Sequence, residues 1–189
     1  RPGSVWEQTL VFPEGKRWFY AADTVTLAND GVGTALRIDM PGHIRHRGGD
    51  RFERIYLSYD GVYASDQFTK DFAPDARYRY VRQPGEPPKR FIRAYRLRDP
   101  RTGRRGPWLA GMTLNPEVVS EAWCHQRGYV SMIQEVGGGV YRKGDQIRAA
   151  YLIGYFDSLE EMDRTFDREA GPVAIEVKGE SWRLVKPGE

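Results

Sequence analysis

Acid–base chemistry is best supported by two neighbouring extended segments on either side of a bend at Arg127. Side chains alternate between the two faces of a strand, so Trp123 and His125 share one face before the bend. After the bend, Tyr129 and Glu135 share one face for the same reason. If the two strands pair, His125 and Glu135 project from the same sheet surface. A carboxylate and an imidazole on one surface can act as general base and general acid on a hydroxyl group.

The same residues also have an interpretation without chemistry. Glu135 can form an ion pair with a nearby arginine, and His125 can cap the end of a strand. In that case Trp123 and Tyr129 offer aromatic rings on a flat face, where a ligand can stack. The two interpretations differ in whether His125 and a carboxylate converge within hydrogen-bond reach in one pocket.

Three features follow one another in the last third of the chain: the stretch 129–135, the turn at 141–145 and the apolar run that ends at Phe156. This succession resembles the C-terminal part of galactose-mutarotase-like (aldose epimerase) domains. The resemblance implies a β-sandwich that acts on sugars, in which Glu135 takes the proton of the anomeric hydroxyl. It also implies a catalytic histidine, for which His43 and His125 are both candidates.

Trp123 resembles the tryptophan found before this strand in the sugar-phosphate epimerase branch of that family. Two features depart from the family pattern. Lys143 stands where the family's turn carries proline, and a complete family member is much longer than 189 residues. The chain is therefore expected to be either a reduced sandwich or one part of a larger protein.

His43 and His46, followed by Glu53, form a pattern that is similar to the first metal-binding motif of the cupins. Metal ligands on one face of a strand need a spacing of two residues, whereas these histidines are three apart and point to opposite faces of an extended chain. The further histidine of the cupin pattern is also absent. We therefore expect no metal site and interpret both as exposed loop histidines, with a cupin-like metal-binding protein kept as an alternative.

Positive charge is concentrated in the segment 89–105, which carries eight basic residues and one acid. Arginine mixed with aromatic residues is typical of nucleic-acid-binding surfaces, but no nucleic-acid-binding motif accompanies it. Guanidinium groups also bind carboxylate or sulfate through paired hydrogen bonds, and aromatic side chains stack on sugar rings. We expect a carbohydrate, in particular an acidic one, rather than nucleic acid, and assign Arg54 and Arg127 to binding its hydroxyl or acidic groups.

The single cysteine, Cys124, excludes an intrachain disulfide framework and a multi-cysteine zinc site. It is adjacent to His125, but neighbouring side chains of a strand point apart and cannot form a thiol–imidazole dyad. We expect Cys124 to be buried as a small hydrophobic residue.

The elements that must position these residues are short strands bounded by Gly, Pro, Asn and Asp. Their regular spacing, together with 21 glycines, 12 prolines, 5 Trp, 11 Tyr and 8 Phe, favours an all-β fold and excludes a helical bundle. The clearest hairpin joins 24–27 to 34–40 through a turn at 29–31, and Pro41-Gly42 is expected to end its second strand. The run 146–156 is the most apolar and is expected inside a sheet.

One helix is expected, over about 158–169. Ser158 and Glu161 have the spacing of a capping box, in which each side chain binds the backbone N–H of the other residue. Leu159, Met162 and Phe166 form one apolar stripe, and a Gly-Pro pair ends the helix.

The sequence therefore predicts a single antiparallel β-sandwich domain over residues 1–189, with one short helix. The net charge of +3 indicates no class of partner, and no apolar run approaches the roughly 20 residues that span a membrane, so we expect no membrane partner. A cytoplasmic location and export after loss of a signal both stay open.

The predicted function is a carbohydrate-active domain of mutarotase-like type that needs no cofactor. His125, Glu135 and His43 are its catalytic candidates. The alternative is a non-catalytic carbohydrate-binding or structural sandwich, with a partner domain or a second copy as its neighbour.

Overall fold

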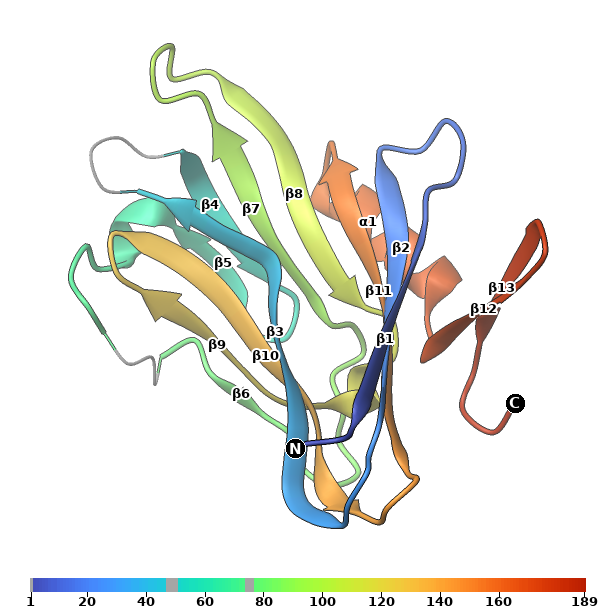
Figure 1. Ribbon diagram of the computed structural model, residues 1–189. Helices are drawn as coiled ribbons and strands as arrows, with labels where there is room; N and C mark the ends of the chain where they lie inside the picture. The colour runs from blue at the N-terminus through green and yellow to red at the C-terminus, as the bar shows by residue number, and fades with distance from the viewer. Residues whose placement is uncertain (1, 47–50, 74–76) are drawn as a thin grey trace.

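The computed structural model describes residues 2–46, 51–73 and 77–189. They form two antiparallel sheets that pack against each other, one helix and a C-terminal hairpin (Figure 1). The prediction of an all-β antiparallel sandwich with one short helix is thereby confirmed. Within these ranges no helix is both long and apolar enough to cross a membrane.

The larger sheet has seven strands in the order β1-β2-β11-β8-β7-β4-β5. In chain order these strands are β1 (Val5–Val11), β2 (Trp18–Thr26), β4 (Phe52–Leu57), β5 (Gly61–Ala64), β7 (Ile92–Arg98), β8 (Arg105–Thr113) and β11 (Gln146–Phe156). The apolar strand β11 lies inside the sheet between β2 and β8, as predicted.

The smaller sheet has four strands in the order β3-β10-β9-β6. They are β3 (Gly31–Arg45), β6 (Tyr80–Val81), β9 (Val119–Gln126) and β10 (Tyr129–Tyr141). The remaining elements are the 3-10 turns η1 (Ser65–Gln67) and η2 (Pro116–Val118) and the hairpin of β12 (Ala174–Lys178) and β13 (Ser181–Val185).

The expected hairpin between β2 and β3 is wrong. β2 pairs with β1 and β11, whereas β3 crosses to the other sheet and pairs with β10. The expected break at Pro41-Gly42 is wrong too, because β3 continues through the Met40-Pro41 bond to Arg45. Proline is tolerated there because β3 is an edge strand, whose outer N–H groups are not needed for pairing.

A fully buried arginine ties the two sheets together. Arg93 of β7 donates hydrogen bonds to the backbone oxygens of Ile133 (2.7 Å) and Met40 (2.9 Å) and to Oε1 of Gln134 (2.9 Å). Burial lowers the pKa of Arg93, since the charged form loses its water. These three acceptors hold β3 and β10 in place over the larger sheet.

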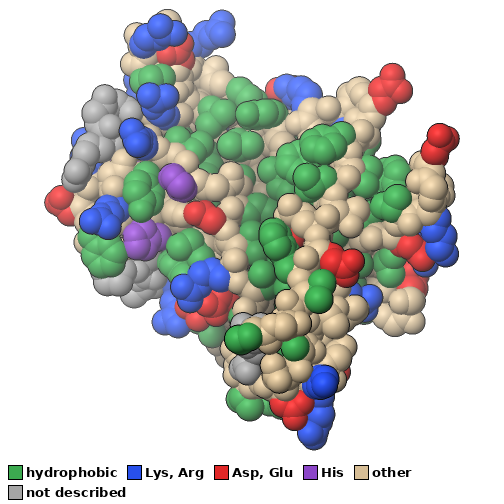
Figure 2. Space-filling model, in the orientation of Figure 1, with side chains coloured by type: hydrophobic (Ala, Val, Ile, Leu, Met, Phe, Trp, Pro, Cys, Tyr) green, Lys and Arg blue, Asp and Glu red, His purple; other side chains and the backbone are tan. Residues whose placement is uncertain are grey.

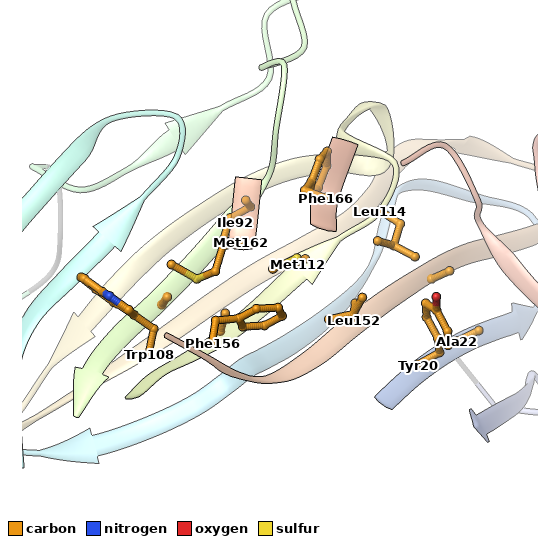
Figure 3. Packing of buried hydrophobic residues seen from close by; sticks show 13 residues of the cluster. Tyr20, Ala22, Ile92, Trp108, Met112, Leu114, Leu152, Phe156, Met162 and Phe166 are labelled. Carbon is orange, nitrogen blue, oxygen red and sulfur yellow. The ribbon is translucent and has the colours of Figure 1, made fainter. Parts of the chain in front are cut away.

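The helix α1 (Leu159–Glu169) packs on the face of the larger sheet that points away from the smaller sheet. Ser158 Oγ accepts the N–H of Glu161 at 3.1 Å, as predicted, but the expected return bond is wrong, because the Glu161 carboxylate accepts the N–H of Asp157 at 2.7 Å instead of that of Ser158. Figure 3 shows Met162 and Phe166 pointing into the cluster of Trp108, Met112 and Phe156, where all of these residues are buried.

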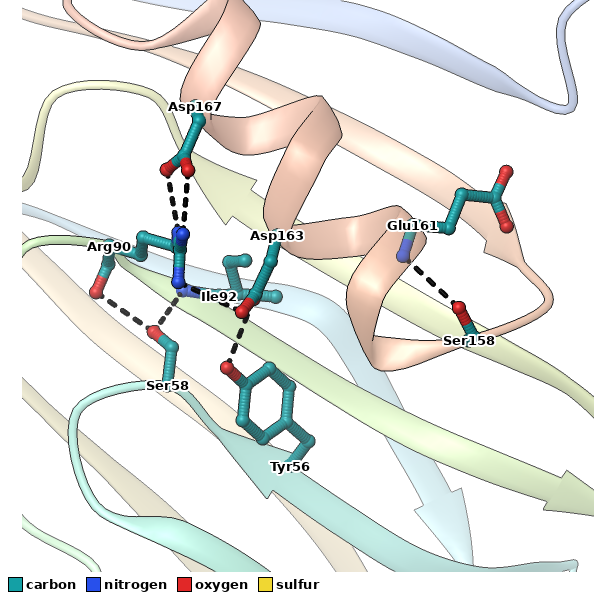
Figure 4. A network of polar contacts seen from close by, with 8 residues as sticks. All are labelled: Tyr56, Ser58, Arg90, Ile92, Ser158, Glu161, Asp163 and Asp167. Carbon is teal, nitrogen blue, oxygen red and sulfur yellow. Dashed lines mark hydrogen bonds and ion pairs between the residues drawn. The ribbon is translucent and has the colours of Figure 1, made fainter.

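Ion pairs fasten the outer side of α1 to the sheet (Figure 4). The guanidinium of Arg90 binds both oxygens of Asp167 at 2.6 Å and one oxygen of Asp163 at 2.8 Å. The hydroxyl of Tyr56 on β4 donates to Asp163 at 3.2 Å. Burial and the neighbouring Asp163 carboxylate raise the pKa of Tyr56 to about 12, so this donor stays protonated.

Candidate functional site

Five of the seven predicted site residues lie on one surface, the outward face of the four-stranded sheet. They are His43 on β3, Trp123 and His125 on β9, and Tyr129 and Glu135 on β10. β9 and β10 pair directly, and the residues that alternate with the named ones, Cys124, Val130, Met132 and Gln134, are buried toward the core. The predicted alternation and pairing of these two strands are thus present.

Four aromatic rings form a continuous row on this face, which we call the ring ladder. The ring of Phe72, which is 60% exposed, lies 5.2 Å from His125. His125 lies 6.2 Å from Tyr129, and Tyr129 lies 5.0 Å from His43. These centroid distances are typical of interacting aromatic pairs, so the rings support one another's orientation.

Polar groups border the ring ladder. Ser131 lies between His43 and His125 in the strand register, and its Oγ donates to Oδ2 of Asp39 at 2.6 Å. Nδ1 of His43 lies 3.5 Å from the same oxygen. Ser, His and Asp meet there, but in the wrong order for a nucleophilic triad, because the serine donates to the carboxylate rather than to the imidazole. Figure 2 shows the histidine surface of this face beside acidic and hydrophobic surface.

Glu135 is held by an arginine. Its Oε1 accepts from Nη2 of Arg37 at 2.6 Å and from Nε at 3.1 Å. The same guanidinium lies 5.3 Å from the ring centroid of Trp123. Glu121, which is opposite Glu135 on β9, accepts a hydrogen bond from Nε of Arg79 at 2.8 Å. Glu135 therefore has the ion-paired environment of the non-catalytic interpretation.

The strand register separates His125 from Glu135. His125 is opposite Ser131, and Glu135 follows four residues later on the same strand. At about 3.3 Å per residue, this offset places the two side chains roughly 13 Å apart along the sheet. His125 contacts the rings of Phe72 and Tyr129. The geometry therefore does not support a concerted action of both groups on a single hydroxyl.

The two predicted binding arginines lie apart from each other. Arg127 is exposed in the β9–β10 turn, where its N–H donates to the carbonyl of Tyr129 at 3.0 Å, next to the ring ladder. Arg54 is on β4 of the other sheet and shares the face of Tyr56, which α1 covers. The layers of the sandwich thus separate Arg54 from the outward face of the smaller sheet.

His46 is buried rather than exposed in a loop, and its ring lies 5.8 Å from Phe52 in the core. His43 lies in β3 and is exposed, so the two histidines do point to opposite sides. Among the residues that the structure describes, no three His, Cys, Asp or Glu side chains come together as a metal site would require. Cys124 is fully buried, as predicted.

Four surface clefts of about 280, 300, 380 and 450 Å³ lie away from the ring ladder. The largest lies between the β1–β2 turn and α1, and Lys16, Trp18 and Arg164 are among the residues that line it. None of the seven predicted site residues lines any of these four clefts. The five that share the outward face of the smaller sheet thus lie outside these four clefts.

Four residues of the site were not predicted as functional candidates from the sequence: Arg37, Asp39, Phe72 and Ser131. The alternation of side chains along a strand puts Ser131 on the face of Tyr129 and Glu135, and it puts Arg37 and Asp39 on one face of their own strand. The signal that was missing is the pairing of β3 with β10, which is remote in sequence. Phe72 comes from an irregular segment and carried no signal.

Comparisons with protein-family models, with curated proteins and with solved structures find no match for this chain. The resemblance to mutarotase-like domains therefore stays a prediction.

Proposed function

We propose that the protein is a carbohydrate-binding β-sandwich whose ligand lies on the outward face of the four-stranded sheet. The observation that carries this proposal is the ring ladder, which places Phe72, His125, Tyr129 and His43 side by side on an open surface. Aromatic side chains present large apolar areas at a small cost in side-chain entropy, which suits them to stack on the flat faces of sugar rings.

The polar groups around the ring ladder suit the hydroxyls of a sugar. Asp39 and His43 lie at one side of Tyr129, and both are exposed. Ser131 already holds the Asp39 carboxylate in place, so little orientational freedom is lost when a hydroxyl binds it. Such fixed partners favour a specific orientation of the ligand.

Two arginines favour an acidic carbohydrate. Arg45 is directly opposite Tyr129 in the register of β3 and β10, and Arg127 is in the adjoining turn. Both are exposed and can bind a carboxylate or sulfate with paired hydrogen bonds. The proposed ligand class is therefore a glycan with uronic acid or sulfate groups.

The mutarotase-like alternative has weaker support from the geometry. It needs a base and an acid at one anomeric centre. Glu135, however, is paired with Arg37, and it lies four residues along β10 from Ser131, the residue opposite His125. Binding without turnover is consistent with both observations.

A glycan array followed by titration calorimetry tests the proposal. We expect binding to acidic oligosaccharides and a loss of at least tenfold, about 1.4 kcal/mol, in Tyr129→Ala. Tyr155→Ala is the matched control, because Tyr155 is 44% exposed on β11 of the other sheet and should leave binding unchanged. Arg45→Ala should weaken binding of acidic glycans more than that of neutral ones. Absence of glycan binding, or equal affinities of wild type and Tyr129→Ala, would contradict the proposal.

A further inference from the structure

The edge strand β1 leaves a row of apolar side chains exposed. In the described residues β1 pairs on one side with β2 and is the last strand of the larger sheet. Val5 is 56%, Trp6 60% and Leu10 47% exposed. Natural edge strands are usually protected by lysine, proline or a bulge, because a free edge recruits further strands. The segment 5–11 contains no lysine or proline, and its pairing with β2 runs without a bulge.

We propose that β1 pairs with β1 of a second copy of this chain, antiparallel about a two-fold axis at Gln8. The two seven-stranded sheets then form one continuous sheet. The inference is independent of the proposed carbohydrate binding, because the ring ladder is on the other sheet. Among the residues that the structure describes, no strand pairs with the outer side of β1 (Figure 1).

The sequence of β1 is self-complementary in this register. A two-fold axis at the central residue, Gln8, pairs all seven residues of the strand. It places Trp6 opposite Leu10 on one face of the sheet, and Val5 opposite Val11 on the other. Glu7 then faces an uncharged threonine. Apolar cross-strand pairs of this kind stabilise a sheet.

The neighbouring registers are worse. An axis at Glu7 places the two Glu7 carboxylates opposite each other, and like charges in that position are destabilising. An axis at Thr9 places Leu10 opposite Gln8 and leaves Trp6 beyond the paired segment. The chain therefore selects the register at Gln8 over both alternatives.

The tryptophan of this edge is already held in position. Nε1–H of Trp6 donates to Oδ1 of Asp23 at 2.9 Å, and Nε2–H of Gln8 donates to the same oxygen at 3.1 Å. An indole fixed in this way loses little freedom when Leu10 of a second copy packs on it. Figure 2 shows separate hydrophobic patches on this side of the molecule.

Sedimentation velocity over a range of protein concentrations tests the proposal. We expect a reversible dimer of the wild-type chain, and at least a tenfold larger dissociation constant in Leu10→Lys. Val62→Lys is the matched control, because Val62 is 42% exposed on β5, at the opposite edge of the same sheet. Circular dichroism verifies that both variants fold. A monomeric wild type, or a dimer that Leu10→Lys leaves intact, overturns the proposal.

Cysteine cross-linking tests the register itself. Residues that face each other in antiparallel strands have Cα atoms about 4.5–5.5 Å apart, within the range that a disulfide bridges. Gln8→Cys places two thiols opposite each other, whereas Glu7→Cys faces Thr9 of the second copy. Under mild oxidation we expect rapid covalent dimers of Gln8→Cys and slow ones of Glu7→Cys, with Cys124 buried in both. Equal rates, or faster linkage of Glu7→Cys, overturn the register.

Discussion

Arg37 and Glu135 face each other across β3 and β10 and form a two-point ion pair, with N–O distances of 2.6 and 3.1 Å. The arginine side chain is 66% exposed and the glutamate 25%. The guanidinium also lies over Trp123, so the pair orients an aromatic residue at the margin of the ring ladder. Glu135 thus has the arginine partner that the non-catalytic interpretation expects, whereas the mutarotase-like interpretation makes it a catalytic base.

Glu135→Gln separates these interpretations. Glutamine keeps an oxygen that accepts from Arg37, so we expect glycan binding to stay within about twofold and stability within about 1 kcal/mol of the wild type, as for other exposed ion pairs. Calorimetry and thermal unfolding measure both quantities. If the chain does turn over a sugar and Glu135→Gln abolishes this turnover while folding is retained, Glu135 is a base and the mutarotase-like interpretation is correct.

The pair of Arg90 and Asp167 predicts a dependence of stability on pH. Hydrogen bonds from Arg90 lower the pKa of Asp167, so its ionised form is favoured by folding. Its contribution is complete above the unfolded pKa near 3.8 and is lost as the pH falls through the lower folded value. We expect Asp167→Asn to lower the melting temperature at neutral pH and to match the wild type in strong acid.

Glu14→Gln, in the exposed turn after β1, is the control for this measurement. It should show no comparable difference at neutral pH. If the difference in melting temperature between Asp167→Asn and the wild type stays constant down to strong acid, the ion pair is not the cause of that difference.

Asp23 should affect the pH dependence of stability in the opposite direction. Burial raises its pKa, although the hydrogen bonds from Trp6 and Gln8 oppose that shift. Folding therefore favours the protonated form, and stability falls as the pH rises from the unfolded pKa through the folded one. We expect Asp23→Asn to raise the melting temperature at neutral pH, since asparagine keeps the accepting oxygen without the buried charge.

The gain from Asp23→Asn should shrink as the pH falls and the wild-type carboxyl becomes protonated. A scan of melting temperature against pH for the two proteins measures this difference. A loss of stability at neutral pH would mean that the charge itself is needed to hold Trp6 and Gln8.

Local patterns were enough to predict part of the fold. Ser158 and Glu161 predict the start of α1 because a helix cap depends on residues three positions apart. The faces of β9 and β10 follow from alternation, and the short turn at Arg127-Gly128 makes their pairing the nearest available one. The shared surface of Trp123, His125 and Tyr129 could therefore be predicted.

Pairings between distant segments could not be predicted in the same way. The partner of β3 is β10, about a hundred residues later, and no local feature of residues 29–31 excludes the shorter hairpin with β2. Arg54 was assigned to the site by its charge, but the layer it belongs to depends on the order of strands in the sheet. The bond from Ser131 to Asp39 depends on the same missing pairing.

Cys124, the only thiol of the chain, is fully buried between the sheets beside Val130 and Met132. A thiol reagent can reach it only when the sandwich opens, so the labelling rate measures how often the two layers come apart. Any ligand that binds the closed form must slow this labelling in proportion to its occupancy. The protein thus carries its own reporter, with which ligands can be screened without an activity assay.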